Sequence, residues 1–232
     1  GFYSLYYNTL GYDNVAVGSS ALQNNTTGYQ NTAIGGLALA TNTTGMCNTA
    51  IGYAALQYNT TGYHNIGVGF HSLYHNMTGI NNIALGLEGL YYNTTGVHNF
   101  AVGYWALFSN TTGYQNIAIG QEALYTNSTG YNNIATGYQT LYSNSTGIHN
   151  IASGMWALYE NTTGNNNIAI GYGALVNKTT GSNNIAIGYN TGSGITAGSN
   201  NVIIGGYTGG TAPISATGSN CIVLSDGAGT VR

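Results

Sequence analysis

Gly113–Thr129 reads G-Y-Q-N-I-A-I-G-Q-E-A-L-Y-T-N-S-T, and with small changes this stretch is written again and again along the chain. An asparagine recurs at every seventeenth position from Asn14 to Asn201. A glycine recurs with the same period, at Gly11, Gly28, Gly45, Gly62, Gly79, Gly96, Gly113, Gly130, Gly147, Gly164, Gly181 and Gly198. A fixed period of this kind indicates a repeat architecture in which each unit contacts only its neighbours.

The unit is too short for a helix pair or a propeller blade, which need roughly 34 and 40 residues. Asn116–Ile119 contains β-branched residues and is bounded by glycines, so it predicts a strand, and Gly120 suits the corner that follows. Ala123–Tyr125 predicts a second short strand, and Asn127–Gly130 has the composition of a turn. The sequence therefore predicts an all-β chain, a parallel β-solenoid (β-roll) of 17-residue coils with two short strands each.

Stacked coils place equivalent side chains above one another, so each position of the repeat becomes a ladder. The Asn14–Asn201 column predicts an amide ladder, and the threonine pairs of the turns predict another. Leucine keeps the same step from Leu5 to Leu175, where Gly192 replaces it. Residues 1–191 are therefore expected to form a regular shaft that starts in mid-repeat. Residues 192–232, which gain three residues and hold Pro213, are expected to be irregular last coils, a cap or a handover to another domain.

The predicted strand has apolar residues on both faces. Ile117 and Ile119 point one way and Ala118 the other, because side chains alternate along a strand. The middle column is almost entirely small: Ala16, Ala33, Ala50, Gly67, Ala84, Ala101, Ala118, Ala135, Ala152, Ala169 and Ala186, then Ile203. Apolar residues on both faces indicate burial on both, one inside the coil and one against another surface. The sequence leaves open which face lies inside, and it predicts a homo-oligomer of parallel chains.

Charge and cysteine content exclude several classes of protein. Charged residues make up 3% of the chain and the net charge is −3, so no basic surface for nucleic acid and no cluster for anionic membranes is present. No apolar run is long enough to span a bilayer. Cys47 and Cys221 lie about ten coils apart, too far for a disulfide within the chain at roughly 4.8 Å per coil. They are expected to be free, buried thiols.

The unit N-x-A-I-G-x-x-A, as in Asn116–Ala123, Asn167–Ala174 and Asn48–Ala55, resembles the head repeats of trimeric autotransporter adhesins. With A-L-x-x-N-T-T-G added, it looks like repeats in bacteriophage tail-fibre-like proteins. Ile222–Arg232 is similar to segments that precede the self-cleaving chaperone of such fibres. The resemblance implies a parallel β-roll in which three chains associate, on an extracellular or virion surface. The adhesin repeat is shorter, so no binding residues carry over.

Two sets of residues are candidates for contacts on the outside. The first is the Asn-x-Thr sequons, at Asn25, Asn42, Asn59, Asn76, Asn93, Asn110, Asn127, Asn144, Asn161 and Asn177. They are either glycosylation acceptors of a secreted chain or simply turn residues, which we favour. The second is an aromatic column that either stabilises the stack or contacts glycans, at Tyr74, Tyr91, Phe108, Tyr125, Tyr142 and Tyr159.

His64, His98 and His149 share one column, but His64 and His98 are two coils, about 10 Å, apart, which is too far for one ion within a chain. Only a threefold axis through this column could bring three copies together, and no metal site or cofactor is expected. The few acidic residues are scattered singly and form no catalytic pair, so the sequence does not favour an enzyme. We expect a structural shaft, a rigid spacer with an adhesive role toward cell-surface glycans or a host receptor. A self-assembling extracellular filament remains an alternative, and an ice-binding solenoid would need a flat threonine-rich face.

Overall fold

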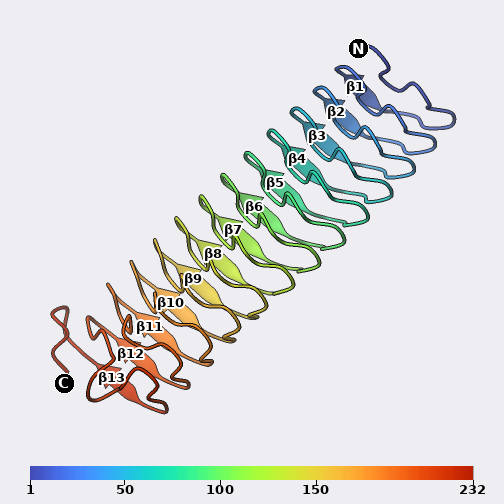
Figure 1. Cartoon of the computed structure of the whole chain (residues 1–232). Coiled ribbons are helices and arrows are strands. Elements are labelled where there is room, and N and C mark those ends of the chain that lie inside the picture. Colours follow the sequence, from blue (N-terminus) through green and yellow to red (C-terminus); the bar gives the residue numbers. More distant parts are fainter. Residues whose placement is uncertain (232) are drawn as a thin grey trace. The chain divides into compact units, whose positions relative to one another are not determined.

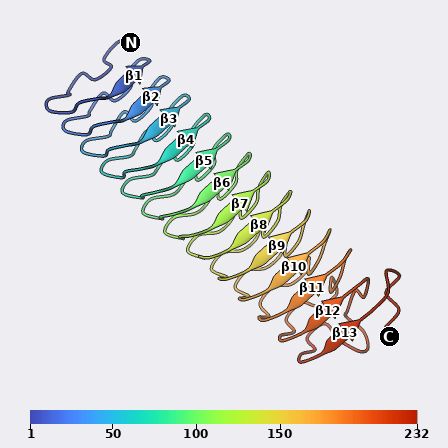
Figure 2. The same ribbon diagram turned by 180° about the vertical axis from the view of Figure 1, so that it is seen from behind.

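The computed structural model describes residues 1–231, and the chain divides into two compact units, Gly1–Gln115 and Asn116–Arg232. Each unit is a succession of coils, and each regular coil contributes one short strand (Figures 1 and 2). The first unit contains β1 (Val15–Val17), β2 (Thr32–Ile34), β3 (Thr49–Ile51), β4 (Ile66–Val68), β5 (Ile83–Leu85) and β6 (Phe100–Val102). The second unit contains β7 (Ile117–Ile119), β8 (Ile134–Thr136), β9 (Ile151–Ser153), β10 (Ile168–Ile170), β11 (Ile185–Ile187), β12 (Val202–Ile204) and β13 (Ile222–Leu224).

Within each unit, every strand pairs in parallel with the strand of the next coil. The register between β2 and β3 places Ala33 opposite Ala50, one repeat apart, and the same step holds for the pairs from β7 to β12. Between β12 and β13 the step is three positions longer, with Ile203 opposite Val223. The parallel β-solenoid with 17-residue coils is thereby confirmed. The described residues contain no helix of the length and hydrophobicity that a bilayer span requires.

The prediction of two strands per coil is wrong, because the second predicted strand is a turn. Ala123–Tyr125 and its equivalents follow a backbone in which alternate residues are left-handed, for example Glu122 (φ 56°) and Leu124 (φ 54°). The left-handed region is unusual for leucine and costs roughly 1–2 kcal/mol per residue. Extended chain would carry the coil outward, whereas this alternation folds it back within a few residues.

Hydrogen bonds between coils hold the left-handed residues in place. The N–H of Leu37 donates to Ser19 O of the preceding coil (2.9 Å), and the N–H of Leu39 donates to Ala55 O of the following coil (3.0 Å). The N–H of Ala38, which lies between them, bonds within its own coil to Gly35 O (3.3 Å). The turn thus joins its neighbours above and below, as a strand does, without being extended.

Neighbouring alanines of this turn test the strain directly. Ala54 (φ 55°) and Ala55 are both fully buried, but only Ala54 is left-handed. Each change to glycine removes a buried methyl group and frees the unfolded chain, whereas Ala54→Gly also relieves strain. We expect Ala54→Gly to be about 1–2 kcal/mol more stable than Ala55→Gly. Urea midpoints of the two variants measure this, and equal midpoints would contradict it.

The alanine column lies inside the coil, which decides the question that the sequence left open. Ala33, Ala50 and Ala84 are 0% exposed, and so are the leucines of the leucine column from Leu22 to Leu175. The outer residues of the strands, such as Ile51 and Ile119, point outward. We call these outward residues of the strands the strand face. Small residues suit the interior because a 17-residue coil closes around very little space.

Two ladders of asparagine run through the interior of each unit. In the first ladder, the side-chain Oδ1 of Asn31 accepts both the backbone N–H (3.0 Å) and the Nδ2 (3.2 Å) of Asn48. In the second ladder, Asn42 Nδ2 donates to Asn25 Oδ1 (2.8 Å). The two ladders meet at one backbone oxygen, because Gly45 O accepts from both Asn31 Nδ2 and Asn42 Nδ2 at 2.9 Å. The predicted amide ladder is confirmed, and the sequon asparagines supply a second one.

The recurrent glycine beside the ladders is required by close approach. A Cβ atom at Gly45 would lie 2.3 Å from Asn42 Oδ1 and 2.5 Å from Gly62 O of the next coil. A Cβ atom cannot lie that close to an oxygen to which it is not bonded. The glycine column therefore allows the coils to stack at the spacing that the ladder bonds need.

Replacing one ladder amide by a carboxylate tests its contribution. Asn65 Nδ2 donates to Asn48 Oδ1 and Gly79 O, and Asn65→Asp turns both contacts into repulsions between buried oxygens. We expect a loss of about 3 kcal/mol or more, smaller at acidic pH, where the carboxyl group can donate one bond. The control Asn81→Asp lies outside the ladders and should change stability by less than about 0.5 kcal/mol. Similar unfolding midpoints for both variants would refute a stabilising role of the ladder.

The leucine column ends at Gly192, and larger residues elsewhere compensate for it. A Cβ atom at Gly192 would lie 2.8 Å from Leu175 Cδ2 and 3.3 Å from Ile203 Cδ1. Ile203, in the alanine column, and Ile195, in the second asparagine column, are both 0% exposed. The inserted residues that follow are held by the Tyr207 hydroxyl, which accepts the Ile214 N–H at 3.0 Å. This part of the second unit lies within the range predicted to be irregular, 192–232.

Candidate functional site

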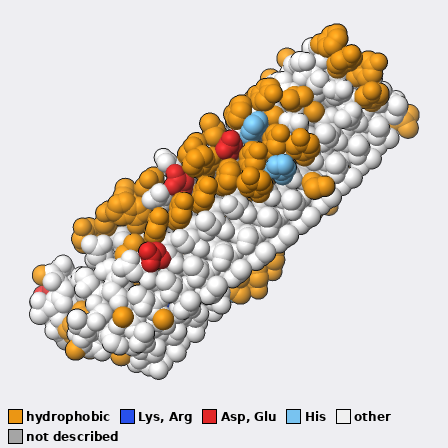
Figure 3. All heavy atoms as spheres, in the orientation of Figure 1, with side chains coloured by type: hydrophobic (Ala, Val, Ile, Leu, Met, Phe, Trp, Pro, Cys, Tyr) orange, Lys and Arg blue, Asp and Glu red, His pale blue; other side chains and the backbone are white. Residues whose placement is uncertain are grey.

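The outward side chains of the turn form an aromatic face on each unit. In the coil of β4 they are Phe70, His71, Tyr74 and His75, and other coils place their side chains at the equivalent positions of the repeat. In Figure 3, hydrophobic side chains gather on the face in view, and histidine and acidic side chains are set among them. We use the name aromatic face for these four columns throughout.

The six predicted aromatic residues are stacked within each unit. Tyr74 and Tyr91 have ring centroids 5.0 Å apart and planes at 8°, and Tyr91 stacks on Phe108 at 5.2 Å. In the second unit, Tyr142 stacks on Tyr125 at 5.0 Å and on Tyr159 at 5.1 Å. All six side chains are half-buried. Much of their ring surface is therefore used in contacts between coils, and the ring edges face outward.

Three phenols of this column, those of Tyr74, Tyr91 and Tyr142, stay uncharged at physiological pH. Burial raises the pKa of Tyr74 to about 12, and the adjacent Tyr58 adds to the shift. Burial also raises the pKa of Tyr91 and of Tyr142. These three tyrosines therefore present neutral hydroxyl groups, which can donate and accept hydrogen bonds, over the whole physiological pH range.

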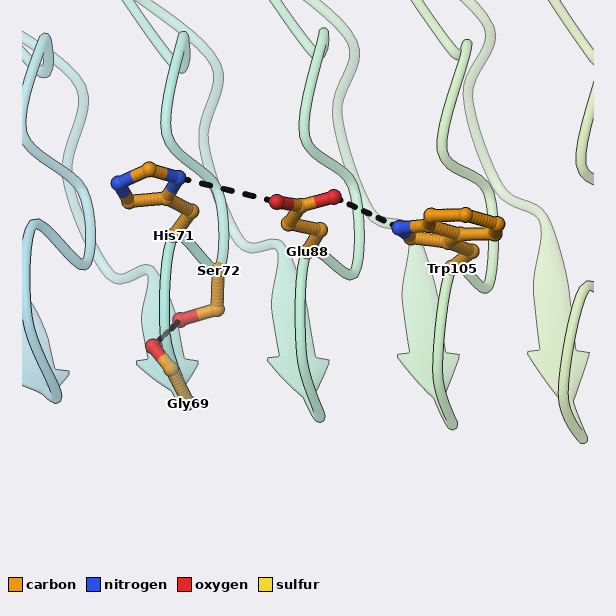
Figure 4. Close-up of polar contacts among 5 residues, drawn as sticks. All are labelled: Gly69, His71, Ser72, Glu88 and Trp105. Atoms are coloured by element: carbon orange, nitrogen blue, oxygen red, sulfur yellow. Dashed lines mark hydrogen bonds and ion pairs between the residues drawn. The ribbon is translucent and has the colours of Figure 1, made fainter.

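A polar row runs beside the stacked rings in the first unit. The Trp105 Nε1–H donates to Glu88 Oε2 (2.6 Å), and Glu88 Oε1 lies 3.8 Å from His71 Nδ1 (Figure 4). Burial lowers the pKa of His71 although Glu88 opposes the shift, so the imidazole is mainly neutral at pH 7. The strong contact of the Glu88 carboxylate is therefore the indole N–H.

The second unit repeats this row with different residues. Gln139 Nε2 donates to Glu122 Oε2 (2.6 Å), and the Trp156 Nε1–H donates to Gln139 Oε1 (2.9 Å). The sequence interpretation missed both rows. The sequence pattern does indicate them, because a side chain that can accept the indole N–H lies one repeat before each tryptophan, Glu88 before Trp105 and Gln139 before Trp156.

A shallow pocket opens at the end of this second row. Its volume is about 350 Å³, and it is lined by Gln139, Trp156, Tyr159, Glu160, Val176 and Asn177. All six residues belong to the second unit. The pocket brings one of the predicted aromatic residues, Tyr159, and one sequon asparagine, Asn177, to the same site. The other five aromatic candidates do not line it.

The sequon asparagines have two different environments. Nine of them are buried in the second ladder, at Asn25, Asn42, Asn59, Asn76, Asn93, Asn110, Asn127, Asn144 and Asn161. A glycan on one of these amides would have to open the ladder, because the amide lies inside the coil. Asn177 alone among the ten has an exposed side chain, and its Nδ2 donates to Ser193 O (2.9 Å). Glycosylation at these sites stays a prediction, and the folded chain accommodates it best at Asn177.

The second ladder has a defect where lysine replaces asparagine. Lys178 occupies the next position after Asn161, is fully buried, and donates its amine to Gly198 O. Within the described residues, the buried Asn161 Oδ1 is left without a hydrogen-bond partner. Burial lowers the pKa of the Lys178 amine to about 8. This coil therefore has both an unsatisfied acceptor and a costly buried cation.

Restoring the ladder should stabilise the second unit. In Lys178→Asn, the new amide can donate to Asn161 Oδ1 and to Gly181 O, and we expect a gain of about 1–3 kcal/mol at pH 7. The folded pKa lies below the unfolded value, so the wild type should gain stability as pH rises from about 8 toward 10.5. The difference in stability between Lys178→Asn and the wild type should therefore shrink over the same pH range.

Urea midpoints at pH 7, 8 and 9 measure both effects. The control Lys178→Met should abolish the pH-dependent term but leave Asn161 Oδ1 unpaired, so its stability at pH 7 should lie below that of Lys178→Asn. A variant Lys178→Asn that is less stable than the wild type at pH 7 would contradict this account of the defect.

The histidine column and the cysteines lie away from the pocket. His64, His98 and His149 are exposed, and all three are left-handed, with φ between 56° and 58°. In the described part of the chain, no group of three His, Cys, Asp or Glu side chains is placed to hold a metal ion. Cys47 and Cys221 are free, as expected, but they are half-buried and not buried. Cys47 shares the column of the exposed histidines, whereas Cys221 follows Asn201 in the first ladder column, and its backbone N–H donates to Asn201 Oδ1 (3.1 Å).

Comparisons with protein-family models, with curated proteins and with solved structures found no significant match to this chain.

Proposed function

We propose that this chain is the shaft of an extracellular or virion fibre, a rigid spacer that assembles with copies of itself and carries an adhesive surface. The observation that carries the proposal is the exposed aliphatic strand face. Ile117, Ile134 and Ile151 are 37%, 37% and 39% exposed although they stack on one another. A flat row of isoleucines in water favours association with another apolar surface.

The strand face suits a second copy of the chain better than the aromatic face does. It is flat, its outer positions are mostly Val, Ile and Leu, and successive coils repeat it in register. Parallel copies would therefore match coil for coil, which is the simplest way to satisfy a repeated surface. The number three rests on the resemblance to trimeric adhesins and tail fibres. The aromatic face, with its neutral hydroxyls and polar rows, is then left for contacts with glycans of a host surface.

The threonine pairs favour a structural role over ice binding. The first threonine of a pair bonds the next coil, as when the Thr26 hydroxyl donates to Thr43 O (3.0 Å). The second threonine, such as Thr27, is exposed. Each unit therefore offers a single outward threonine column and not a broad threonine-rich plane.

Sedimentation equilibrium of the purified chain tests the assembly. A homotrimer should have a mass of about 72 kDa, three times the 24.0 kDa of one chain. Ile134→Lys on the strand face should shift the mass toward 24.0 kDa, because a buried, unpaired charge opposes association. The control Tyr142→Lys lies on the aromatic face and should leave the trimer intact.

A wild-type chain that stays monomeric at high concentration would refute the proposal. Dissociation by Tyr142→Lys, and not by Ile134→Lys, would place the interface on the aromatic face and refute our assignment of the strand face. Electron microscopy separates the filament alternative, since a filament grows end to end to varied lengths and a shaft has one length.

A further inference from the structure

The pocket of the second unit exists because the stacked aromatic column and the polar row beside it end in the same coil, at Tyr159 and Trp156. Tyr159 is the last ring of its column and is followed by Val176. Trp156, three residues earlier, is followed in its own column by Gly173. Large side chains on one coil thus meet small ones on the next. This difference in side-chain size leaves the space of the pocket, which Trp156, Tyr159 and Val176 line.

One face of the Tyr159 ring is used and the other is available. Tyr142 covers the first face, with centroids 5.1 Å apart and planes at 12°. A further tyrosine at position 176 would cover the second face at the same spacing, but valine is too short to do so. The pocket is therefore the space that the next ring of the column would fill. A flat group of about the same size, with an apolar face, would continue the stack.

The walls of the pocket are rigid. The Tyr159 N–H bonds to Trp156 O (3.2 Å), which fixes the two aromatic residues relative to each other. The indole is held by its bond to Gln139 Oε1 (2.9 Å) and by edge-to-face packing on Tyr172 (5.3 Å, 63°). A ligand would therefore enter a preformed site and would not have to order these side chains.

The rim of the pocket carries hydrogen-bond acceptors and no cation. Among the described residues, the Glu160 carboxylate and the Tyr159 hydroxyl have no hydrogen-bond partner, and both residues line the pocket. Asn177 donates its Nδ2 to Ser193 O (2.9 Å), which leaves its Oδ1 as a further acceptor. The amine of Lys178 is turned inward to Gly198 O. A ligand that donates several hydrogen bonds is favoured here, and an anionic one would be repelled by Glu160.

We propose that this pocket binds the pyranose ring of a neutral saccharide, whose apolar C–H face stacks on Tyr159 while its hydroxyls donate to Glu160 and Asn177. A pyranose ring has the size of the missing phenol ring, one apolar face and several hydroxyl donors, so it meets each feature of the site. Acidic sugars are disfavoured because the described part of the aromatic face has no lysine or arginine to pair with them. The inference rests on the proposed adhesive role and gives it a site and a sugar class.

Saturation-transfer-difference NMR on the full chain tests the inference. The probes are the methyl glycosides of glucose, galactose, mannose and N-acetylglucosamine, with N-acetylneuraminic acid as the acidic comparison. At least one neutral glycoside should receive saturation at its ring protons, and the acidic sugar should not. A second readout is the fluorescence of Trp156 in a Trp105→Phe background, where it is the sole tryptophan. Its emission should shift as the glycoside binds.

Filling the pocket separates binding from folding. Val176→Tyr should stack on Tyr159, keep the melting temperature of the wild type or raise it, and weaken glycoside binding at least about tenfold. The matched control Gln23→Tyr adds a tyrosine to the same column in the first unit and should bind as the wild type does. Glu160→Gln, which removes the charge but keeps the shape, should weaken neutral glycosides about threefold or more.

Three results would overturn the inference: no neutral glycoside receives saturation, N-acetylneuraminic acid binds as well as the neutral sugars, or Val176→Tyr binds like the wild type. These outcomes are independent of the assembly. A trimer that does not bind glycosides would refute the saccharide site and agree with the proposed shaft. A monomer that binds glycosides would refute the proposed shaft and agree with the saccharide site.

Discussion

The amide-to-amide hydrogen bond between equivalent asparagines is the interaction on which the rest of each unit depends. A coil of this size encloses only an alanine from its strand, small residues and a leucine from its turn, and two asparagines, so apolar packing alone gives it little definition. Hydrogen bonds are directional, and Gly45 O shows how they are combined, since it receives Asn31 from one ladder and Asn42 from the other. Buried amides must be paired, and outside the defect at Lys178 each ladder amide is paired with its copy in a neighbouring coil. The requirement for a partner therefore fixes both the height of the coils and their register.

The same shortage of space explains the unusual backbone. Left-handed residues such as Leu39, Leu56 and Leu73 are found in one coil after another. Each is tolerated because its N–H bonds the next coil and its side chain is fully buried, as for Leu39 and Ala55 O at 3.0 Å. Strain of this kind persists only where the surroundings determine the conformation. The stacked coils determine the conformation in this way, since each coil imposes the same backbone geometry on the coils next to it.

The sequence was sufficient for the parts of the structure that depend on periodicity. The 17-residue period predicted the parallel coils, the strand around Ala118 and the first amide ladder. It did not predict the turn at Leu124, because the residues A-L-Y suit a strand by composition and the left-handed alternation has no signature in leucine or tryptophan. It also could not decide between the alanine and isoleucine faces, since both are apolar. The inward choice depends on the volume of the coil, which only the closed structure reveals.

For the candidate site, the aromatic column was visible in the sequence but the pocket was not. Tyr142 and Tyr159 differ in their neighbour on the next coil, which is a tyrosine for the first and Val176 for the second. The difference between valine and tyrosine at that position becomes a cavity only when the columns are stacked. The row of Gln139 and Trp156 was hidden for the same reason. Contacts between coils are made by residues that are distant in the chain, so inspecting one unit at a time passes over them.

The register of the ladders also has a consequence for how such a gene can change. Deleting or inserting a single codon within the regular repeats changes the length of one coil, so equivalent asparagines stay opposite one another only if a turn of that coil changes its path. Removing or duplicating the codons of one whole repeat rejoins Asn to Asn and glycine to glycine, so the new junction is the same as every other. Unequal recombination between near-identical repeats makes changes of that kind. The length of the protein is therefore free to drift in whole coils while its cross-section stays constant.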